Sequence, residues 1–357
     1  MVKYPIGRPS LSEQEVRAVA AVVSSGWITQ GAKVAQFETE FAERLGVEHA
    51  VACASGTAAL HLAFVALGLG PGDEVLVPDV TYVATANAVA YTGATPVPVD
   101  VDFLTWSISL EDAERRVTER TRAVVPVHLY GVPCDMDKLH AFARKYDLYV
   151  VEDASEALGA EWDQRACGTL SFAGTFSFYA NKILTTGEGG AVVTNDAAQA
   201  DVLRLLRGQG QTPGRQYVHQ CVGYNYRMTE MQAALGLVQL SRLDSMLESR
   251  HRVVDRYFDL LGGAIASPMT RQSAPWLYTG LLPEHSTYGE VAAGLVEKGI
   301  ETRPVFVPLH ALSMYARPAA NYPAAEELSR RGISLPTWPE LTDEDVEVIV
   351  TAVKGVL

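Results

Sequence analysis

The stretch AVVPVHLYGVPCDMDKLHAFARKYDLYVVED, residues 123–153, contains the repeating unit that decides the fold. Residues 123–127 and 148–151 are short apolar runs without polar alternation, which is typical of strands covered on both faces. Between them, residues 137–145 have the apolar spacing of a helix. A strand, a helix and a second strand in succession predict a parallel pair of strands with the helix packed on one face.

The same alternation of strands and helices extends from about residue 48 to residue 195. Helical segments such as residues 57–67 and 110–117 separate the remaining strand-like runs, which are residues 50–54, 74–77, 96–99, 175–178 and 191–194. The last two runs are too close in sequence to be joined by a full helix. The pattern therefore predicts an α/β protein whose large domain has a mixed, mostly parallel, seven-stranded sheet between helices.

Two helix starts flank this region. Ser12-Glu13-Gln14-Glu15 is a capping box, and Val16, Val19, Ala20 and Val23 follow it on one helix face. A second capping box, Thr229-Glu230-Met231-Gln232, begins an apolar pattern that runs to residue 261. We expect this segment to be one long helix that forms a spine between two domains.

The C-terminal part has the pattern of a smaller α+β domain. Strands are expected at residues 276–282 and 305–307, and helices at residues 287–298 and from residue 343 onward. We therefore divide the chain into residues 1–240, with the large domain and the start of the spine helix, and residues 241–357.

Composition limits the classes of function. The chain has 357 residues, of which 48% are hydrophobic and 20% charged, so it can bury a large core and is not disordered. Its net charge of −13 argues against a nucleic-acid partner. No apolar run reaches the roughly 18 residues that a spanning helix needs, so no membrane partner is expected.

The location and metal content can also be predicted. The first residues lack the apolar region of a secretory signal. The four cysteines, at positions 53, 134, 167 and 221, are far apart and have no histidine at metal-binding spacing. We expect reduced, buried thiols, no metal site and a cytoplasmic protein.

Three local motifs carry chemistry. Ser55-Gly56-Thr57 lies between a strand and a helix, where backbone N–H groups form a phosphate site, although Ser55 or Thr57 could simply cap the helix. Asp153 follows a buried strand, at the sheet edge where ligands bind, or is a loop acid that caps the next segment. Lys182 follows an aromatic strand, where burial would lower the pKa of its amine, or it is a surface lysine.

Together the three motifs fit pyridoxal phosphate (PLP). A lysine can form a Schiff base with the cofactor, and a carboxylate can keep the pyridine nitrogen protonated, so that the ring accepts electrons. A helix start can hold the phosphate. The motifs of nucleotide hydrolysis, dinucleotide binding, zinc proteolysis and esterase chemistry are missing from the sequence.

Several further motifs resemble those of the PLP-dependent sugar aminotransferases of the fold type I superfamily. They include residues 55–60 (SGTAAL), 126–131 (PVHLYG), 152–154 (EDA), 187–190 (GEGG) and 223–228 (GYNYRM). The similarity extends from Gly26 to Phe306 and implies the fold type I architecture, a transaminase activity and PLP. Within the family, residues 152–157 and 181–186 look most like enzymes that aminate a 4-keto-6-deoxy sugar nucleotide.

The resemblance assigns roles to the cofactor residues. Lys182 would be the catalytic Schiff-base lysine and later the proton shuttle, and Asp153 would pair with the pyridine nitrogen. Asn225 would reach the phosphate from the neighbouring subunit, which implies a homodimer with its active sites at the interface. The other implied cofactor contacts are Ser55, Gly56, Thr57 and Ser177 at the phosphate, Tyr82 stacked on the ring, and Glu156 near the ring hydroxyl.

The substrates that the resemblance implies are an amino donor, glutamate or glutamine, and a keto-deoxysugar similar to GDP-4-keto-6-deoxymannose. The residues expected to line the substrate side are Trp27, Glu188, Tyr278, Arg303 and His310. Two features depart from the family pattern: Val307 replaces an expected histidine, and residues 262–275 form a short segment. They leave open a keto-cyclitol or a 3-keto sugar nucleotide as the substrate.

Two other functions are less compatible with the sequence. A PLP-dependent sugar dehydratase of this fold replaces the lysine with histidine, whereas this chain has Lys182. A PLP-binding regulatory protein without turnover would need a damaged site or a DNA-binding domain. The cofactor positions are filled, and the charge of −13 disfavours DNA binding.

Overall fold

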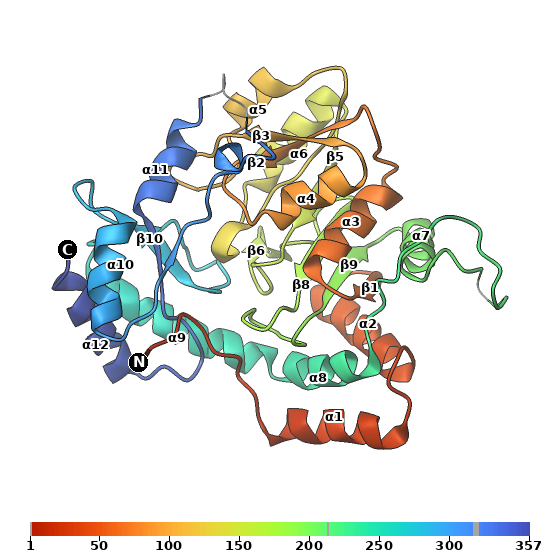
Figure 1. Ribbon diagram of the computed structural model, residues 1–357, viewed down its shortest axis with the longest axis horizontal. Helices are drawn as coiled ribbons and strands as arrows, with labels where there is room; N and C mark the ends of the chain where they lie inside the picture. The colour runs from red at the N-terminus through yellow and green to blue at the C-terminus, as the bar shows by residue number, and fades with distance from the viewer. Residues whose placement is uncertain (1, 213, 317–320) are drawn as a thin grey trace.

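The computed structural model describes residues 2–212, 214–316 and 321–357, and its centre is a seven-stranded sheet flanked by helices (Figure 1). The strand order is β1-β9-β8-β5-β4-β2-β3. Neighbouring strands from β8 to β3 are parallel, whereas β9 runs antiparallel to both β8 and β1. The prediction of a mixed, mostly parallel, seven-stranded sheet is confirmed.

The strands of this sheet are short, and most of their residues are buried. Their bounds are β1 (His49–Cys53), β2 (Glu74–Pro78), β3 (Thr95–Val99), β4 (Thr121–Val124), β5 (Tyr149–Asp153), β8 (Ala173–Ser177) and β9 (Gly190–Thr194). A small hairpin that the sequence analysis did not predict, β6 (Glu161–Trp162) with β7 (Arg165–Ala166), lies between β5 and β8.

Helices connect and cover the strands. In the first 210 residues they are α1 (Glu13–Ser25), α2 (Ala32–Leu45), α3 (Gly56–Ala66), α4 (Ala84–Tyr91), α5 (Leu110–Arg116), the 3₁₀ helix η1 (Leu129–Gly131), α6 (Met136–Tyr146) and α7 (Ala197–Arg207). The capping box predicted at Ser12 is present. Because helices cover the parallel strands, the strands are apolar along their length rather than alternating.

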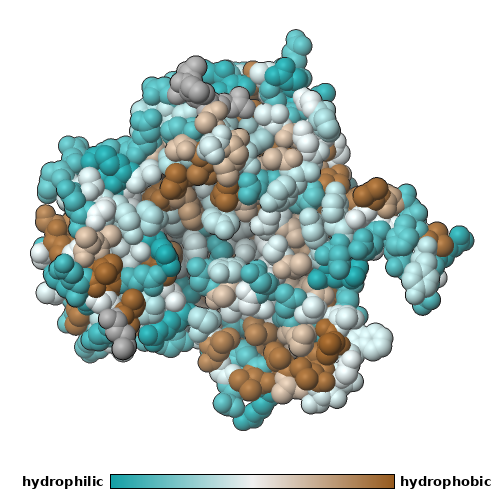
Figure 2. Space-filling view, viewed as in Figure 1, coloured by the Kyte–Doolittle hydropathy of each residue, from teal (hydrophilic) through white to brown (hydrophobic). Residues whose placement is uncertain are grey.

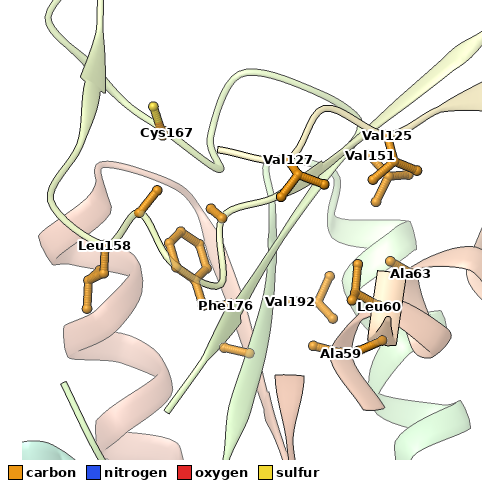
Figure 3. Packing of buried hydrophobic residues seen from close by; sticks show 14 of the residues in the cluster. Ala59, Leu60, Ala63, Val125, Val127, Val151, Leu158, Cys167, Phe176 and Val192 are labelled. Carbon is orange, nitrogen blue, oxygen red and sulfur yellow. The ribbon is translucent and has the colours of Figure 1, made fainter. Parts of the chain in front are cut away.

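The main core lies between this sheet and its helices. Phe37 and Phe41 of α2 pack edge-to-face against Phe178, and Phe41 also packs against Phe176 of β8. Helix α3 packs against β8 and β9 and contributes to the same hydrophobic cluster. Figure 3 shows Leu60 of α3 beside Val192 of β9. The end of β8 and the start of α3, which carry predicted cofactor residues, are therefore set on a rigid base.

The predicted spine helix is two helices rather than one. They are α8 (Glu230–Ser241) and α9 (Leu243–Leu261), which follow one another across the lower part of Figure 1, with α1 below α8. Arg242 between them leaves helical geometry, with φ −104° and ψ 0°. Its guanidinium donates a hydrogen bond of 2.6 Å to Glu15 of α1, so a contact distant in sequence holds the break.

A second, three-stranded sheet forms the C-terminal α+β part, with the order β10-β12-β11. Its elements are β10 (Tyr278–Leu281), α10 (Tyr288–Glu297), β11 (Arg303–Pro304), the 3₁₀ helix η2 (Leu309–Ala311), α11 (Pro323–Arg331), β12 (Gly332–Leu335) and α12 (Asp343–Lys354). The division at residues 240 and 241 stays a prediction.

Two local expectations were wrong, and one strand was missed. Residues 305–307, predicted as a strand, are not one: the strand is β11 at Arg303–Pro304, and the residues after it leave the sheet and cross toward β2. Residues 332–335 form a strand that was not predicted. Cys221 is exposed, whereas the other three cysteines are buried as expected. Among the described residues, no helix is long and apolar enough to cross a membrane.

Candidate active site

A cavity of about 780 Å³ opens where the parallel strands end. The segments that follow β2, β4, β5 and β8 all reach it, because parallel strands end at one sheet edge. Residues 276–277 and 303–307, from the C-terminal part of the chain, also line it. The predicted site residues that line this cavity are Ser55, Gly56, Thr57, Tyr82, Asp153, Glu156, Ser177, Lys182, Glu188 and Arg303.

Lys182 is buried rather than on the surface. Its side chain is 13% exposed, and its Nζ lies 3.4 Å from Oε1 of Glu156. The same Nζ lies 3.7 Å from the ring centroid of Trp276, at cation–π distance. Burial lowers the pKa of the Lys182 amine, and the carboxylates of Glu156 and Asp153 only partly oppose this effect. A larger share of the amine is therefore neutral and nucleophilic near neutral pH.

Glu156 is also buried, and its two oxygens have different partners. Oε2 accepts a hydrogen bond of 2.9 Å from the N–H of Tyr130, and Oε1 faces Lys182. Tyr130 has φ 52°, in the left-handed region. Burial raises the pKa of Glu156, whereas the charge of Lys182 lowers it, with a net rise. The carboxyl group can therefore hold a proton more readily than an exposed glutamate.

Asp153 ends β5 and is held by the segment that follows another strand. Its Oδ2 accepts a hydrogen bond of 2.8 Å from Oγ1 of Thr85, and its Oδ1 accepts one of 3.1 Å from the N–H of Ser155. Oγ1 of Thr85 in turn lies 3.0 Å from Oγ1 of Thr81. These contacts fix the orientation of the carboxylate, which lines the cavity.

The start of α3 forms a small, close-packed cradle. Ser55 caps the helix, since its Oγ accepts a hydrogen bond of 3.1 Å from the N–H of Ala58. A Cβ added to Gly56 would lie 2.7 Å from Cβ of Ser177, and one added to Gly190 would lie 2.4 Å from the carbonyl oxygen of Ser55. Larger residues would push the helix start away from the strands, so these glycines keep its N–H groups at the cavity.

Four aromatic side chains, which we call the aromatic row, follow one another along the cavity wall: Tyr82, Phe306, Tyr130 and Trp276. Successive ring centroids are 5.7, 5.4 and 5.9 Å apart. The exposed ring of Tyr82 begins the row, and the Trp276 ring under Lys182 ends it. Of these four residues, only Tyr82 has a role that was expected from the sequence.

Four predicted residues do not line the cavity of this single chain. Tyr278 is fully buried in the core of the smaller sheet, where its ring contacts Tyr257 and Phe258. The ring of His310 is bound to Asp79. Trp27 is 66% exposed and its indole N–H donates to the carbonyl of Gln30, and Asn225 is exposed beside Gly208. Burial in a separate core excludes Tyr278 from direct contact with a ligand in the cavity.

Sequence reasoning missed Thr85, Tyr130, Trp276 and Phe306. Thr81 and Thr85, four positions apart just after β2, were the available signal for a polar contact at the strand end. The aromatic row joins residues from four separate segments, so its pattern was not visible in the sequence. Val307, which departs from the family pattern, lines the cavity and is 53% exposed.

Comparisons with known proteins agree with this geometry. The model of the DegT/DnrJ/EryC1/StrS aminotransferase family matches residues 9–354. GDP-perosamine synthase of Caulobacter vibrioides is 45% identical over 99% of this chain and 98% of its own, and that of Escherichia coli O157:H7 is 41% identical over the same shares. The PLP form of the putative sugar aminotransferase Spr1654 from Streptococcus pneumoniae is 31% identical, with a TM-score of 0.93 over 99% of each chain.

The cavity fits pyridoxal phosphate. It places a buried amine, a carboxylate with a fixed orientation and a glycine-lined helix start around one space. Lys182 can hold the aldehyde carbon, Asp153 the ring nitrogen and the start of α3 the phosphate. Each of these residues was predicted from the sequence, and their meeting in one cavity supports the assigned roles.

We expect Lys182→Ala to lose covalent attachment of the cofactor, because no other lysine lines the cavity among the described residues. The wild-type protein with added PLP should turn yellow. After borohydride reduction, mass spectrometry should find the reduced cofactor covalently attached to residue 182. Lys138→Ala removes a lysine whose side chain is 77% exposed and should label like the wild type. Persistent labelling of Lys182→Ala would assign the attachment to another residue.

Proposed function

This chain belongs to the DegT/DnrJ/EryC1/StrS aminotransferase family, and from that premise we propose that it aminates a nucleotide-linked keto-deoxysugar. It is a PLP-dependent transaminase. The proposed amino donor is glutamate or glutamine, and the proposed acceptor is similar to GDP-4-keto-6-deoxymannose. The observation that carries the proposal is the buried amine of Lys182, which shares one cavity with Asp153 in a chain 45% identical to a GDP-perosamine synthase.

Lys182 has the central role in the proposed reaction. When bound, PLP supplies an electron-withdrawing ring that stabilises negative charge at the carbon where the proton is lost. Lys182 binds the cofactor at rest, and its released, neutral amine removes the proton from Cα of the amino donor. The amine would pass this proton to the cofactor as the 2-oxo acid is formed, and in the second half it would carry a proton from the cofactor to the sugar carbon. A positioned proton carrier of this kind contributes roughly 10²–10⁴-fold to the rate.

The other polar residues orient and stabilise the cofactor. Asp153 pairs with the ring nitrogen and keeps it protonated, with its carboxylate already oriented by Thr85. The N–H groups at Gly56 and Thr57 bind the phosphate, helped by Ser55 and Ser177. These bonds are made before any substrate arrives, so no reorganisation is needed during the reaction.

The ring itself has two proposed contacts. Tyr82 stacks on one face of the ring, and its side chain is 58% exposed at the cavity. Glu156 lies near the ring hydroxyl, where a proton on its carboxyl group avoids repulsion between two negative oxygens. The raised pKa of buried Glu156 supports this role.

The proposed substrate side of the cavity has two charged side chains. Arg303 and Glu188 line the cavity, and we propose that they contact the sugar nucleotide. The guanidinium of Arg303 forms a 2.6 Å ion pair with Glu301 and is 61% exposed. A guanidinium at this position can bind a diphosphate through two parallel hydrogen bonds.

We also propose a homodimer whose partner completes each site. Val16 and Val23 of α1 are 60% and 55% exposed, although the sequence pattern placed them on an apolar helix face. Figure 2 shows apolar side chains gathered over α1. A contiguous exposed apolar face of this kind marks an interaction site.

The segment that carries Asn225 supports the same arrangement. Residues 211–212 and 214–222, which precede Asn225, extend away from the body of the protein on the right of Figure 1. Tyr217 and Val222 in this segment are 88% and 87% exposed. Asn225 lies outside the cavity of its own chain, as expected of a residue that serves the partner's phosphate. We further propose that the enzyme acts in the cytoplasm, where reduced thiols such as the free cysteines of this chain persist.

An amino-donor assay with a panel of ketones tests the substrate. We expect glutamate or glutamine to support amination of GDP-4-keto-6-deoxymannose, measured as the aminated product by mass spectrometry. Keto-cyclitols and 3-keto sugar nucleotides should give lower kcat/KM values. A higher kcat/KM for either of these classes would overturn the proposed substrate while leaving the transaminase activity intact.

A complementation experiment tests the shared site. Lys182→Ala and Asn225→Ala should each lower activity strongly when present in both subunits. A randomly reassorted 1:1 mixture of the two variants should regain about a quarter of wild-type activity, because about half of the dimers are mixed and each mixed dimer carries one site with neither substitution. If Asn225 instead served its own subunit, no mixed site would be intact and activity would not return.

A further inference from the structure

We propose that Asp79 and His310 are positioning residues that anchor residues 303–307, which we call the substrate wall, to the cofactor side of the cavity. The proposal rests on the function proposed above, because it assigns the substrate wall to the sugar. Neither residue lines the cavity among the described residues, so both would act through the segments that they join.

Asp79 follows directly after β2 and is fully buried. Its N–H donates to the carbonyl of Val99 in β3, whereas the partners of its carbonyl oxygen and its carboxylate come from η2, more than 200 residues later in the chain. Its carbonyl oxygen accepts a hydrogen bond of 2.8 Å from the N–H of Leu309, and its Oδ1 accepts one of 2.8 Å from the N–H of His310. Its Oδ2 lies 2.5 Å from Nδ1 of His310. A carboxylate that is buried needs such partners, so the contact is a strong one.

The ring of His310 is fixed from its other sides as well. It stacks on Tyr322 with ring centroids 4.4 Å apart and an angle of 6° between the planes. Its Nε2 lies 3.7 Å from Oε1 of Glu326. The guanidinium of Arg116 lies over the ring of Tyr322, which holds that ring in turn. The position of His310 is therefore determined by contacts with several elements, which is typical of an anchor.

The substrate wall is held at two ends by two different sheets. At its start, Arg303 and Pro304 pair with β12 of the smaller sheet, and the N–H of Val305 donates to the carbonyl of Gly332 at 3.2 Å. At its end, the chain reaches Asp79 at the edge of the large sheet. Phe306 and Val307, between these ends, line the cavity.

The segment that holds the wall also carries contacts to the cofactor side. Residues 79–85 include Tyr82, whose ring lies 5.7 Å from that of Phe306, and Thr85, which donates to Asp153. The anchor therefore sets the distance between the substrate wall and the cofactor contacts. Without the anchor, the substrate wall would stay attached to β12, but its Phe306 would no longer be held beside Tyr82.

The loss should affect the two substrates unequally. An amino acid donor needs to reach only Lys182 and the cofactor, whereas a nucleotide-linked sugar is larger and extends across the cavity to the wall. A displaced wall should therefore weaken sugar binding and leave the donor reaction nearly unchanged. A purely structural role would lower both reactions together or lower only thermal stability.

The test compares His310→Ala and His310→Asn with a matched control, His285→Ala, in the PLP-loaded enzyme. His285 is an exposed histidine of the same C-terminal part, away from the substrate wall. We expect His310→Ala to lower kcat/KM for GDP-4-keto-6-deoxymannose at least about tenfold, the cost of losing one well-placed polar anchor. The rate at which glutamate bleaches the bound cofactor should stay within about twofold.

His310→Asn should restore part of the loss, because its amide N–H can reach the carboxylate as Nδ1 does. Hydrogen exchange of residues 303–312 gives a readout independent of the substrate, and it should speed up in His310→Ala but not in His285→Ala. Equal loss in both half-reactions, or unchanged exchange in His310→Ala, would overturn the anchor. If wild-type enzyme aminates no keto sugar, the proposed function fails, and hydrogen exchange alone decides whether the anchor holds the wall.

Discussion

The hydrogen bond from Thr85 to Asp153 is the contact on which the candidate site depends most. It joins the segment after β2 to the end of β5, two strands separated by β4 in the same sheet. Strand β5 also pairs in parallel with β8, in a register that places Asp153 opposite Thr175. Lys182 follows seven residues after Thr175, so this pairing brings it to the same end of the sheet as Asp153. The sheet therefore positions the proposed ring partner and the proposed covalent attachment together.

The cavity combines charges that would be unfavourable if each were buried alone. The amine of Lys182 lies between the carboxyl group of Glu156 and the face of Trp276. Burial lowers the pKa of the amine and raises that of Glu156, so both groups are shifted toward their neutral forms. An anionic cofactor with a phosphate and a ring hydroxyl would meet a helix start and a carboxyl group able to share a proton. A glutamate at position 156 is therefore compatible with a negatively charged ring oxygen beside it.

The sheet and the cofactor residues could be predicted because their signals are local. Each apolar run, each capping box and each of the short motifs around Ser55, Asp153 and Lys182 lies within a few residues. The break at Arg242, the aromatic row and the contact of Asp79 with His310 depend on residues far apart in the chain, so they have no local pattern. Tyr278 and His310 were predicted as substrate contacts from a resemblance alone. Tyr278 is instead buried in the core of the smaller sheet, and the ring of His310 is paired with Asp79.

The central claim is that the carboxylate of Asp153 pairs with the pyridine nitrogen of PLP and keeps that nitrogen protonated. Nuclear magnetic resonance of enzyme loaded with PLP labelled with ¹⁵N in the ring measures this directly. The account predicts the chemical shift of a protonated nitrogen in the wild type and of an unprotonated nitrogen in Asp153→Asn, with the cofactor still attached to Lys182. The same shift in both proteins would contradict it.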